Sequence, residues 1–388
     1  MAIPLLYNVR HLRTRPAAAA MTAVGIALPT AALLFALALP AGLNRVLRSS
    51  GDESRLVILR KGAVAETGSA IDRETARLIE TLPGIAKNAA NRPLCSPEAA
   101  ILVNVPRRDG KRTNLLVRGT GERGRELRPA VRLVEGRWFE PGLPELTVSR
   151  RIATRFENLG LGETIKFGRS DWRVVGIFEA AGTSSDSEAW ADADLLMADF
   201  RRTLYTSVLV RAVSPEVQAS IVRTLAEDER FSLRGVPEPE YFALQTREVG
   251  IPVEFVGMLV SILLAVGATV GAANTMYAAV AQRTREIAVL RAIGFRRRAV
   301  LASFLFETFL LALAGGAVGC AIAFAAFHGR ATSTVNWISF SDVVFQFRIT
   351  PDLLGYGMVF AVAIGLLGGA LPARLAASRG IAASMRAI

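Results

Sequence analysis

The sequence predicts a membrane protein with four transmembrane α-helices and a large α/β extracytoplasmic domain between helices 1 and 2. Hydrophobic residues make up 51% of the 388 residues, and the mean hydropathy of +0.35 is too high for an ordinary soluble protein of this length. The second observation is the pattern along the chain: one long apolar stretch precedes a mixed segment of about 200 residues, and three more follow it.

Each predicted span is long enough to cross a bilayer, which requires about 20 consecutive apolar residues in a helix. The first stretch is too long for the core of a signal peptide and has no convincing cleavage site, so we expect it to remain as an anchor. The four spans cover residues 16–43, 251–281, 299–327 and 353–373.

Arginines flank these spans on one side. They cluster before the first span, between the second and third, and after the fourth, whereas the loop between the third and fourth spans holds only Arg330 and Arg348. Positively charged flanks are retained in the cytoplasm. This predicts a multi-pass membrane protein, with residues 1–15, 282–298 and 374–388 in the cytoplasm and residues 44–250 and 328–352 on the outer side.

The same arginines account for much of the basic charge. Lys and Arg total 46 against 34 Asp and Glu, a formal net charge of +12. No basic patch interleaved with aromatic residues accompanies this charge, so we expect no nucleic-acid partner. Two cysteines and two histidines exclude a zinc cluster or a disulfide framework and argue against metal-based or histidine-based catalysis.

The outer segment alternates short β-like runs with helical candidates, which indicates α/β structure. Ser214 and Pro215 give a strong start signal for one of these helices, because they supply an N-cap and a proline in the first turn. The β-like runs include residues 55–59, 100–105, 114–118, 172–178 and 207–211, and the helical candidates are residues 72–81, 149–158 and 215–227.

One glycine motif in this segment is a candidate nucleotide site. Gly119, Gly121 and Gly124 spell G-x-G-x-x-G after a β-like run. A dinucleotide site needs a helix that opens at the third glycine, but residues 125–129 are short and end in proline, and the Lys-Ser/Thr of a P-loop is absent. We therefore interpret the motif as a turn and expect no ATPase, no catalytic residue and no bound cofactor or metal in this chain.

The cytoplasmic loop at residues 282–298 carries the strongest signal. Ile287, Leu290 and Ile293 recur at helical spacing among charged residues, and Gly294 follows. This pattern predicts a short amphipathic helix ended by the glycine, whose apolar ridge could dock in a groove of a cytoplasmic partner. The alternative is a retention loop that is helical without docking.

Small and acidic residues inside the spans form a second group of candidates. Gly267 with Gly271 and Gly365 with Gly369 permit close helix packing. Glu307 lies about two turns into the third span, where a charge facing lipid would cost about 2–3 kcal/mol. We expect Glu307 to face protein in a structural role near the amphipathic helix, with proton or substrate transfer as the alternative.

Residues 283–294 (RTREIAVLRAIG) resemble the coupling-helix signature of the MacB/FtsX-type ABC transporter permeases, and further similarities cover nearly the whole chain. The similarity extends to the motif that closes the family's sequences, here residues 372–386, but Ile381 stands where the family has a proline and Met385 where it has a leucine. These differences affect the expected contacts of the tail and not the resemblance. The other similar segments are residues 8–12, 21–26, 135–139 (EGRWF), 174–177 and 274–276, together with Glu307.

The resemblance implies a permease subunit of the bacterial inner membrane, which pairs with a second copy or a homologue in the membrane lipid. It also implies a separate cytoplasmic ABC ATPase that binds this subunit and holds the ATP and Mg. A periplasmic adaptor is a further partner compatible with it. The implied function is export or extraction of a substrate on the outer face by mechanotransmission, and the alternative is an FtsX-like regulator of an envelope hydrolase that carries no substrate. The residues expected to dock the ATPase are Arg283, Arg285, Glu286, Leu290, Arg291 and Gly294.

Overall fold

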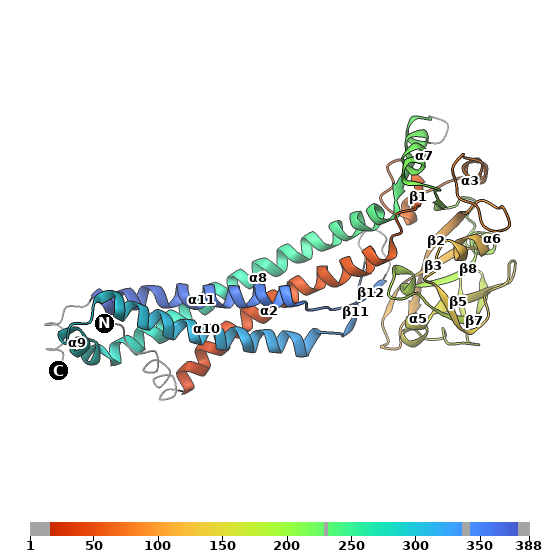
Figure 1. Ribbon diagram of the computed structural model, residues 1–388. Coiled ribbons are helices and arrows are strands. Elements are labelled where there is room, and N and C mark those ends of the chain that lie inside the picture. The colour runs from red at the N-terminus through yellow and green to blue at the C-terminus, as the bar shows by residue number, and fades with distance from the viewer. Residues whose placement is uncertain (1–15, 229–231, 336–341, 379–388) are drawn as a thin grey trace. The chain divides into compact units, whose positions relative to one another are not determined.

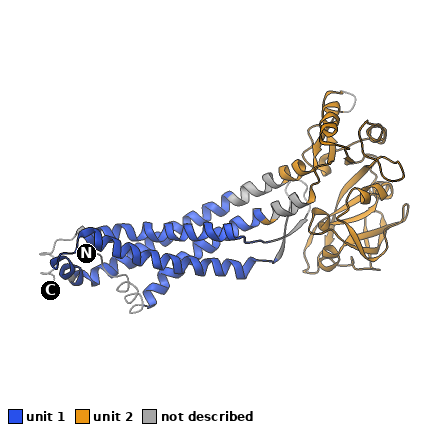
Figure 2. Cartoon of the chain, viewed as in Figure 1, with its two compact units in different colours: residues 1–41, 252–330, 347–388 blue, residues 42–251, 331–346 orange. Residues whose placement is uncertain are grey.

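The computed structural model describes residues 16–228, 232–335 and 342–378. The chain divides into two compact units (Figure 2), a helical unit of residues 1–41, 252–330 and 347–388 and a sheet unit of residues 42–251 and 331–346. The predicted cytoplasmic segment at residues 1–15, part of the outer loop at residues 328–352 and most of the tail at residues 374–388 lie outside the described residues.

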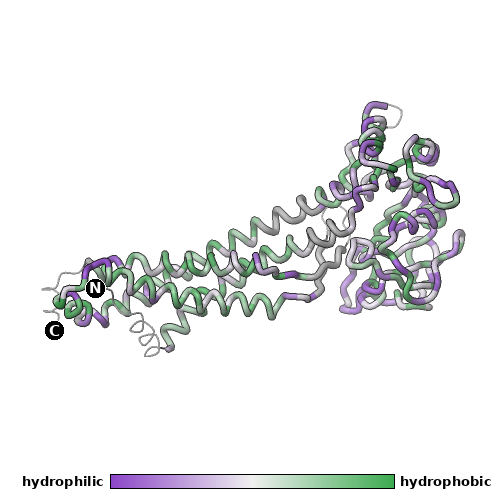
Figure 3. Tube along the Cα trace, in the orientation of Figure 1, coloured by the Kyte–Doolittle hydropathy of each residue, from purple (hydrophilic) through white to green (hydrophobic). Residues whose placement is uncertain are grey.

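Four long helices build the helical unit (Figure 1): α2 (Pro16–Ser50), α8 (Glu238–Gln282), α10 (Arg297–Phe327) and α11 (Pro351–Ser378). Each contains a stretch long and apolar enough to span a membrane, as the hydropathy colouring of Figure 3 shows. The predicted four-span arrangement is therefore confirmed. These stretches are Pro16–Leu39, Phe255–Gln282, Arg297–Phe327 and Pro351–Ala377.

Glycines bring these helices into close contact. A Cβ added at Gly315 of α10 would lie 2.6 Å from the carbonyl oxygen of Ala23 in α2, and one added at Gly365 of α11 would lie 2.5 Å from the Cβ of Ala312 in α10. Any larger residue would push the helices apart, since these separations are shorter than a van der Waals contact.

The predicted packing glycines differ in their surroundings. Gly369 of α11 lies against Thr308, because an added Cβ would lie 2.4 Å from its Cγ2 atom. At Gly267 and Gly271 of α8, an added Cβ would meet no atom within 4 Å. Gly365 and Gly369 thus pack inside this chain, and the role of the α8 pair in packing stays a prediction.

The sheet unit contains a mixed sheet whose described strands follow the order β10-β1-β9-β2-β3-β8-β5-β7-β4, with β6 paired to β7. The pairs β3–β8 and β5–β7 are parallel, and the other pairs are antiparallel. A separate antiparallel hairpin consists of β11 (Ala331–Val335) and β12 (Asp342–Gln346). The strands of the large sheet are β1 (Arg55–Arg60), β2 (Cys95–Pro106), β3 (Arg112–Thr120), β4 (Arg132–Gly136), β5 (Glu145–Ser149), β6 (Thr164–Phe167), β7 (Ser170–Glu179), β8 (Glu188–Asp192), β9 (Ser207–Arg211) and β10 (Leu233–Pro237).

Short helices connect these strands, and α3, α5, α6 and α7 begin with side-chain caps. The carboxylate of Asp72 accepts a hydrogen bond from the Thr75 backbone N–H at 2.8 Å, and the Ser214 hydroxyl accepts one from Val217 at 3.4 Å, so each satisfies a backbone donor that the helix leaves open. With the sheet, they confirm the predicted α/β domain. The helices are α3 (Arg73–Glu80), α4 (Glu122–Glu126), α5 (Arg150–Arg155), α6 (Ala193–Asp199) and α7 (Pro215–Glu227), with 3-10 turns η1 (Glu66–Gly68) and η2 (Ser184–Ser187).

Candidate functional site

The helix that carries the coupling signature is α9 (Thr284–Ala292), which follows α8 after a single residue. The backbone N–H of that residue, Arg283, lies 3.2 Å from the carbonyl oxygens of both Ala279 and Val280. The Thr284 hydroxyl donates to the carbonyl of Ala281 at 2.9 Å. The chain therefore turns from α8 into α9 without a flexible loop, because the hydrogen bonds of α8 continue into the turn.

The other end of α9 is a Schellman motif. Gly294 has a φ of +105°, a backbone conformation that favours glycine. Its N–H donates to the carbonyl of Arg291 at 3.2 Å, and the N–H of Phe295 donates to the carbonyl of Leu290 at 3.1 Å. These are the two bonds that close a Schellman motif, so the sequence RAIGF fixes where the helix stops.

One face of α9 is part of the core of the helical unit. Ile287 and Ala288 are buried, and Ile287 belongs to an apolar cluster supplied by three spanning helices. Burial of this face stabilises α9 against the bundle, by about 0.8 kcal/mol for each buried methylene group. The other buried members of the cluster are Met276 and Val280 of α8, Val300 and Phe304 of α10, and Ala373 and Ala376 of α11.

The opposite face of α9 is exposed. Val289 is 48% and Ile293 66% exposed, and Glu286 is exposed beside them. Positions 286, 289 and 293 lie on one side of a helix because they are three and four residues apart. We call these three residues the docking face. It differs from the predicted ridge, because the apolar stripe is divided: Ile287 packs inward, and Leu290 is half-buried between the two faces.

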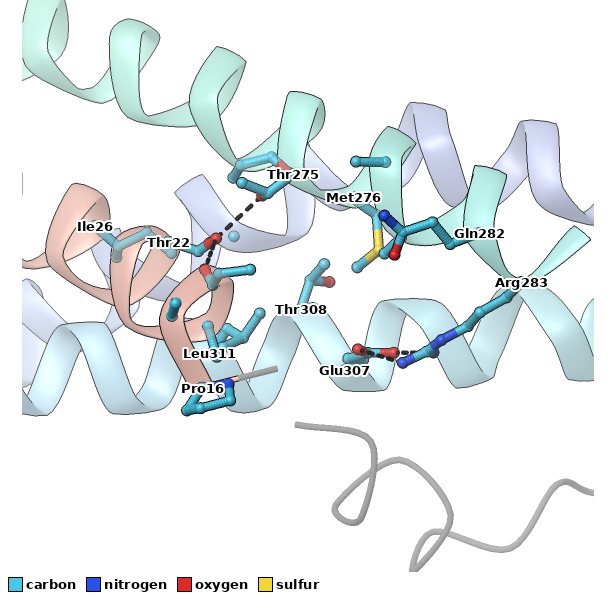
Figure 4. A pocket seen from close by; sticks show the side chains of 17 residues that line it. Pro16, Thr22, Ile26, Thr275, Met276, Gln282, Arg283, Glu307, Thr308 and Leu311 are labelled. Atoms are coloured by element: carbon cyan, nitrogen blue, oxygen red, sulfur yellow. Dashed lines mark hydrogen bonds and ion pairs between the residues drawn. The ribbon is translucent and has the colours of Figure 1, made fainter. Parts of the chain in front are cut away.

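An ion pair anchors the start of α9 to the third span (Figure 4). The guanidinium of Arg283 contacts the carboxylate of Glu307 through two bonds, Nη1–Oε2 at 2.9 Å and Nη2–Oε1 at 3.3 Å. The two side chains are 6% and 8% exposed. The Phe304 ring centroid is 5.9 Å from the guanidinium carbon. Such a buried bidentate pair has a fixed geometry.

This pair changes the interpretation of the predicted docking residues. Arg283 was expected on the docking surface, but the structure buries its side chain because it pairs with Glu307. Arg291 is half-buried, and the side chain of Arg285 lies outside the described part of the chain. Sequence reasoning singled out Arg283 and Glu307 separately but missed their pairing, since 24 residues separate them and no local spacing signals it.

The sheet unit holds a second buried ionic cluster. Arg118 donates to Glu66, Glu98 and Glu188 over distances of 2.7–2.9 Å, and Arg128 donates to both oxygens of Glu98 at 2.6 and 2.7 Å. Burial would raise the pKa of Glu98, but the Arg128 and Arg118 guanidiniums outweigh it and lower the pKa to about 2. This carboxylate is therefore charged at neutral pH and joins two arginines.

The glycine motif lies next to this cluster. A Cβ at Gly124 would lie 1.9 Å from the Thr120 hydroxyl oxygen and 2.9 Å from a carboxylate oxygen of Glu98, and a Cβ at Gly119 would lie 2.8 Å from the Cα of Ala193. The helix α4 begins within the motif, contains Gly124 and has only five residues. These two glycines are explained by close packing. In the described chain, no group of three or more His, Cys, Asp or Glu side chains is arranged to hold a metal ion.

Comparison with known proteins covers both units. The FtsX-like permease C-terminal domain matches residues 258–381, and the MacB-like periplasmic core domain matches residues 19–228. The sheet unit is thus a MacB-like periplasmic domain, and the helical unit includes the permease segment with α9.

Three curated relatives are each 28% identical to this chain. The macrolide export ATP-binding/permease protein MacB 1 of Aeromonas hydrophila subsp. hydrophila aligns over 67% of this chain and 42% of its own length. The pyoverdine export ATP-binding/permease protein PvdT of Pseudomonas entomophila aligns over 63% and 39%, and an uncharacterized ABC transporter permease of Methanocaldococcus jannaschii over 62% of each chain. The chain thus spans less than two thirds of the length of these relatives.

The two domain matches, with the four apolar helices and the α/β domain between the first and the rest, establish the family. The chain belongs to the MacB/FtsX-type family of ABC transporter permeases.

Proposed function

We propose that this chain is the membrane-spanning subunit of an ABC transporter that couples ATP hydrolysis by a separate cytoplasmic ATPase to export or extraction of a substrate on the outer face. The observation that carries the proposal is the construction of α9. Its docking face (Glu286, Val289 and Ile293) is exposed, whereas its inner face and its start are fixed to the bundle.

This construction suits the transmission of force. A partner that displaced the docking face would move α9 as one body, since the Arg283–Glu307 pair and the cluster around Ile287 connect it to α8, α10 and α11. Packed interfaces respond by discrete shifts and do not deform continuously. Motion of the ATPase would thereby reach the spanning helices and, through α2 and α8, the segments that enter the sheet unit.

The partner must supply the nucleotide chemistry. Gly119 and Gly124 pack closely against neighbouring atoms of this chain and are not interpreted as a nucleotide site. The names of two relatives combine ATP binding with a permease function. We assign ATP and Mg to the cytoplasmic partner and no catalytic activity to this chain. The same account requires both termini and α9 to face the cytoplasm of a bacterial cell, as the arginine distribution predicts.

A second permease copy or a homologue is the other proposed partner. Only 11% of the apolar stretch of α8 is buried within the chain, against 50% for α2. Gly267 and Gly271 lie on α8 with open space beside them, and small residues at four-residue spacing favour close helix pairing in membranes. We propose that α8 contributes to the interface of the pair.

The names of the relatives are the basis for proposing export. Two of them are named for export, of macrolides and of pyoverdine, and we propose export or extraction for this chain without choosing a substrate. The match of residues 258–381 to the FtsX-like permease C-terminal domain supports a second candidate. In it, the same docking face receives ATPase motion and the outer domain regulates an envelope hydrolase.

The test is a pull-down of the full chain from native membranes in mild detergent, with mass spectrometry of the partners. Val289→Asp and Glu286→Arg should lose an ATP-binding protein that the wild type retains, because a buried unpaired charge opposes docking. Val64→Asp is the matched control, since Val64 of the sheet unit is 51% exposed. Retention of the ATPase by both docking-face variants would contradict the proposal. Co-purified envelope proteins, an adaptor or a hydrolase, would separate the two candidate functions.

A further inference from the structure

The helical unit contains a cavity of about 430 Å³ between α2, α8, α10 and α11 (Figure 4). Its volume falls in the range of small-molecule sites, about 300–1,000 Å³. The space exists because the walls consist largely of small side chains. The lining includes Ala18, Thr22 and Ile26 of α2, Ala278 of α8, Thr308 of α10 and Gly365 of α11.

The hydroxyl groups in the cavity wall already have partners. The Thr22 hydroxyl donates to the carbonyl of Ala18 at 3.0 Å and lies 3.0 Å from the Thr275 hydroxyl. The Thr308 hydroxyl donates to the carbonyl of Leu305 at 2.9 Å. A polar solute would therefore lose hydrogen bonds to water without gaining equivalent ones along these walls, whereas an apolar chain would lose none.

The cavity extends about as far as one leaflet of a bilayer. Its lining on α8 runs from Ala272 to Gln282, which is about 15 Å along the axis at 1.5 Å per residue. The hydrocarbon core of a bilayer is about 30 Å thick, so this length is close to half of it. The cavity reaches Arg283, the residue after the end of α8, and runs from there toward the middle of the span.

The polar end of the cavity offers an unfilled donor. The Nε atom of Arg283 is buried and has no hydrogen-bond acceptor in the described chain, although both Nη atoms bind Glu307. Gln282 lies beside it in the lining. Because Glu307 already neutralises the guanidinium, a second anion here would meet its carboxylate. This N–H therefore suits a neutral acceptor such as an ester carbonyl.

We propose that this cavity binds one acyl chain of a glycerophospholipid from the adjoining leaflet, with an ester carbonyl oxygen accepting a hydrogen bond from Arg283 Nε and the chain extending toward Ile26 and Gly365. The apolar walls, the length of one leaflet and the charge-neutral Arg283–Glu307 pair at the interfacial end agree on this occupant. A bound lipid would fill space behind the Arg283–Glu307 pair and support α9 from within the bundle. This goes beyond the proposed ATPase coupling and does not depend on it.

The test uses the purified full chain in phosphatidylcholine vesicles that contain a small fraction of phosphatidylcholine with a diazirine on one acyl chain. After irradiation, mass spectrometry locates the labelled residues. We expect labelling to concentrate on cavity residues, to fall about tenfold in Ala18→Trp, whose indole would occupy the space, and to stay at the wild-type level in Ala20→Trp. Both alanines are exposed on α2, but only Ala18 lines the cavity.

A second pair of variants, on α8, controls for misfolding of the α2 variants. Ala278→Trp on α8 should also abolish cavity labelling, and Ala281→Trp, outside the lining, should not. An ether-linked probe without the carbonyl should label the cavity about fivefold less than the ester. Labelling spread evenly over the exposed surfaces of the spanning helices, or unchanged by Ala18→Trp and Ala278→Trp, would overturn the proposal. Equal labelling by ester and ether probes would overturn the assignment of the ester carbonyl as the acceptor for Arg283 Nε.

Discussion

The Arg283–Glu307 pair gives the sharpest prediction of the account. Glu307→Gln keeps the shape of the side chain and removes its charge, so a buried guanidinium remains without its counter-ion. With the 2.9 Å separation and an effective dielectric constant of about 20, the lost attraction is about 6 kcal/mol before solvation is counted. Loss of one partner from a buried pair typically destabilises a protein by about 3–5 kcal/mol. We therefore expect Glu307→Gln to lower the free energy of unfolding by about 3–5 kcal/mol.

The assay is unfolding of the purified full chain in mild detergent, compared with two controls. Replacement of both residues, Arg283→Met with Glu307→Met, leaves no unpaired charge and should recover most of the loss. Asp194→Asn removes one partner of the Arg73–Asp194 pair, whose side chains are 49% and 61% exposed, and should cost less than about 1 kcal/mol.

The reasoning would be refuted if Glu307→Gln were no more destabilising than Asp194→Asn. It would also be refuted if the double replacement were as unstable as the single one, since an unpaired buried charge would then not be the cause. If the pair connects α9 to the third span as proposed, Glu307→Gln should in addition retain the ATPase partner but reduce stimulation of its activity by substrate.

Three further predictions concern acid stability, helix packing and the end of α9. The lowered pKa of Glu98 stabilises the folded state above the unfolded-state pKa of about 4.3, and this contribution, on the order of 3 kcal/mol, should be lost as pH falls toward 2. Acid unfolding followed by tryptophan fluorescence should depend less on pH in Glu98→Gln, and an unchanged acid profile would contradict this prediction. Gly315→Leu should destabilise the helical unit by about 1–3 kcal/mol or more, because its Cβ would clash with the Ala23 carbonyl. Gly267→Leu should leave the thermal unfolding of the monomer nearly unchanged but should weaken cross-linking between copies. Gly294→Ala should lower the free energy of unfolding by about 1–2 kcal/mol, because the φ of +105° suits glycine. Hydrogen exchange should then show reduced protection across α9, and equal protection would contradict the role of the Schellman motif in ending the helix.

Most of the helices that the sequence predicts follow from local patterns. The spans follow from hydropathy, which depends only on neighbouring residues, and α9 follows from its period and the glycine after it. The capped start of α7 was recognisable for the same reason, since Ser214 and Pro215 act within one turn. The extension of α2 to Ser50 and of α8 back to Glu238 was missed, because those segments are helical but lack the apolar composition of a span.

Long-range pairing set the limit of prediction from sequence. The cluster at Arg118 joins residues from β2, β3, β8 and η1, and a single sequence contains no signal for which acid meets which arginine. The inward turn of Ile287 depends in the same way on surfaces supplied by α8, α10 and α11. A stripe of apolar residues shows that a helix has an apolar face, but it does not divide that face between its own core and a partner.

The most direct test of the central claim is photo-cross-linking from single positions of α9 in native membranes. Val289 and Ala288 are neighbours, yet Val289 is 48% and Ala288 only 2% exposed. A photoreactive amino acid at Val289 should cross-link to an ATP-binding protein, and the same residue at Ala288 should cross-link within this chain. An ATPase captured equally from both positions, or from neither, would contradict the assignment of the docking face.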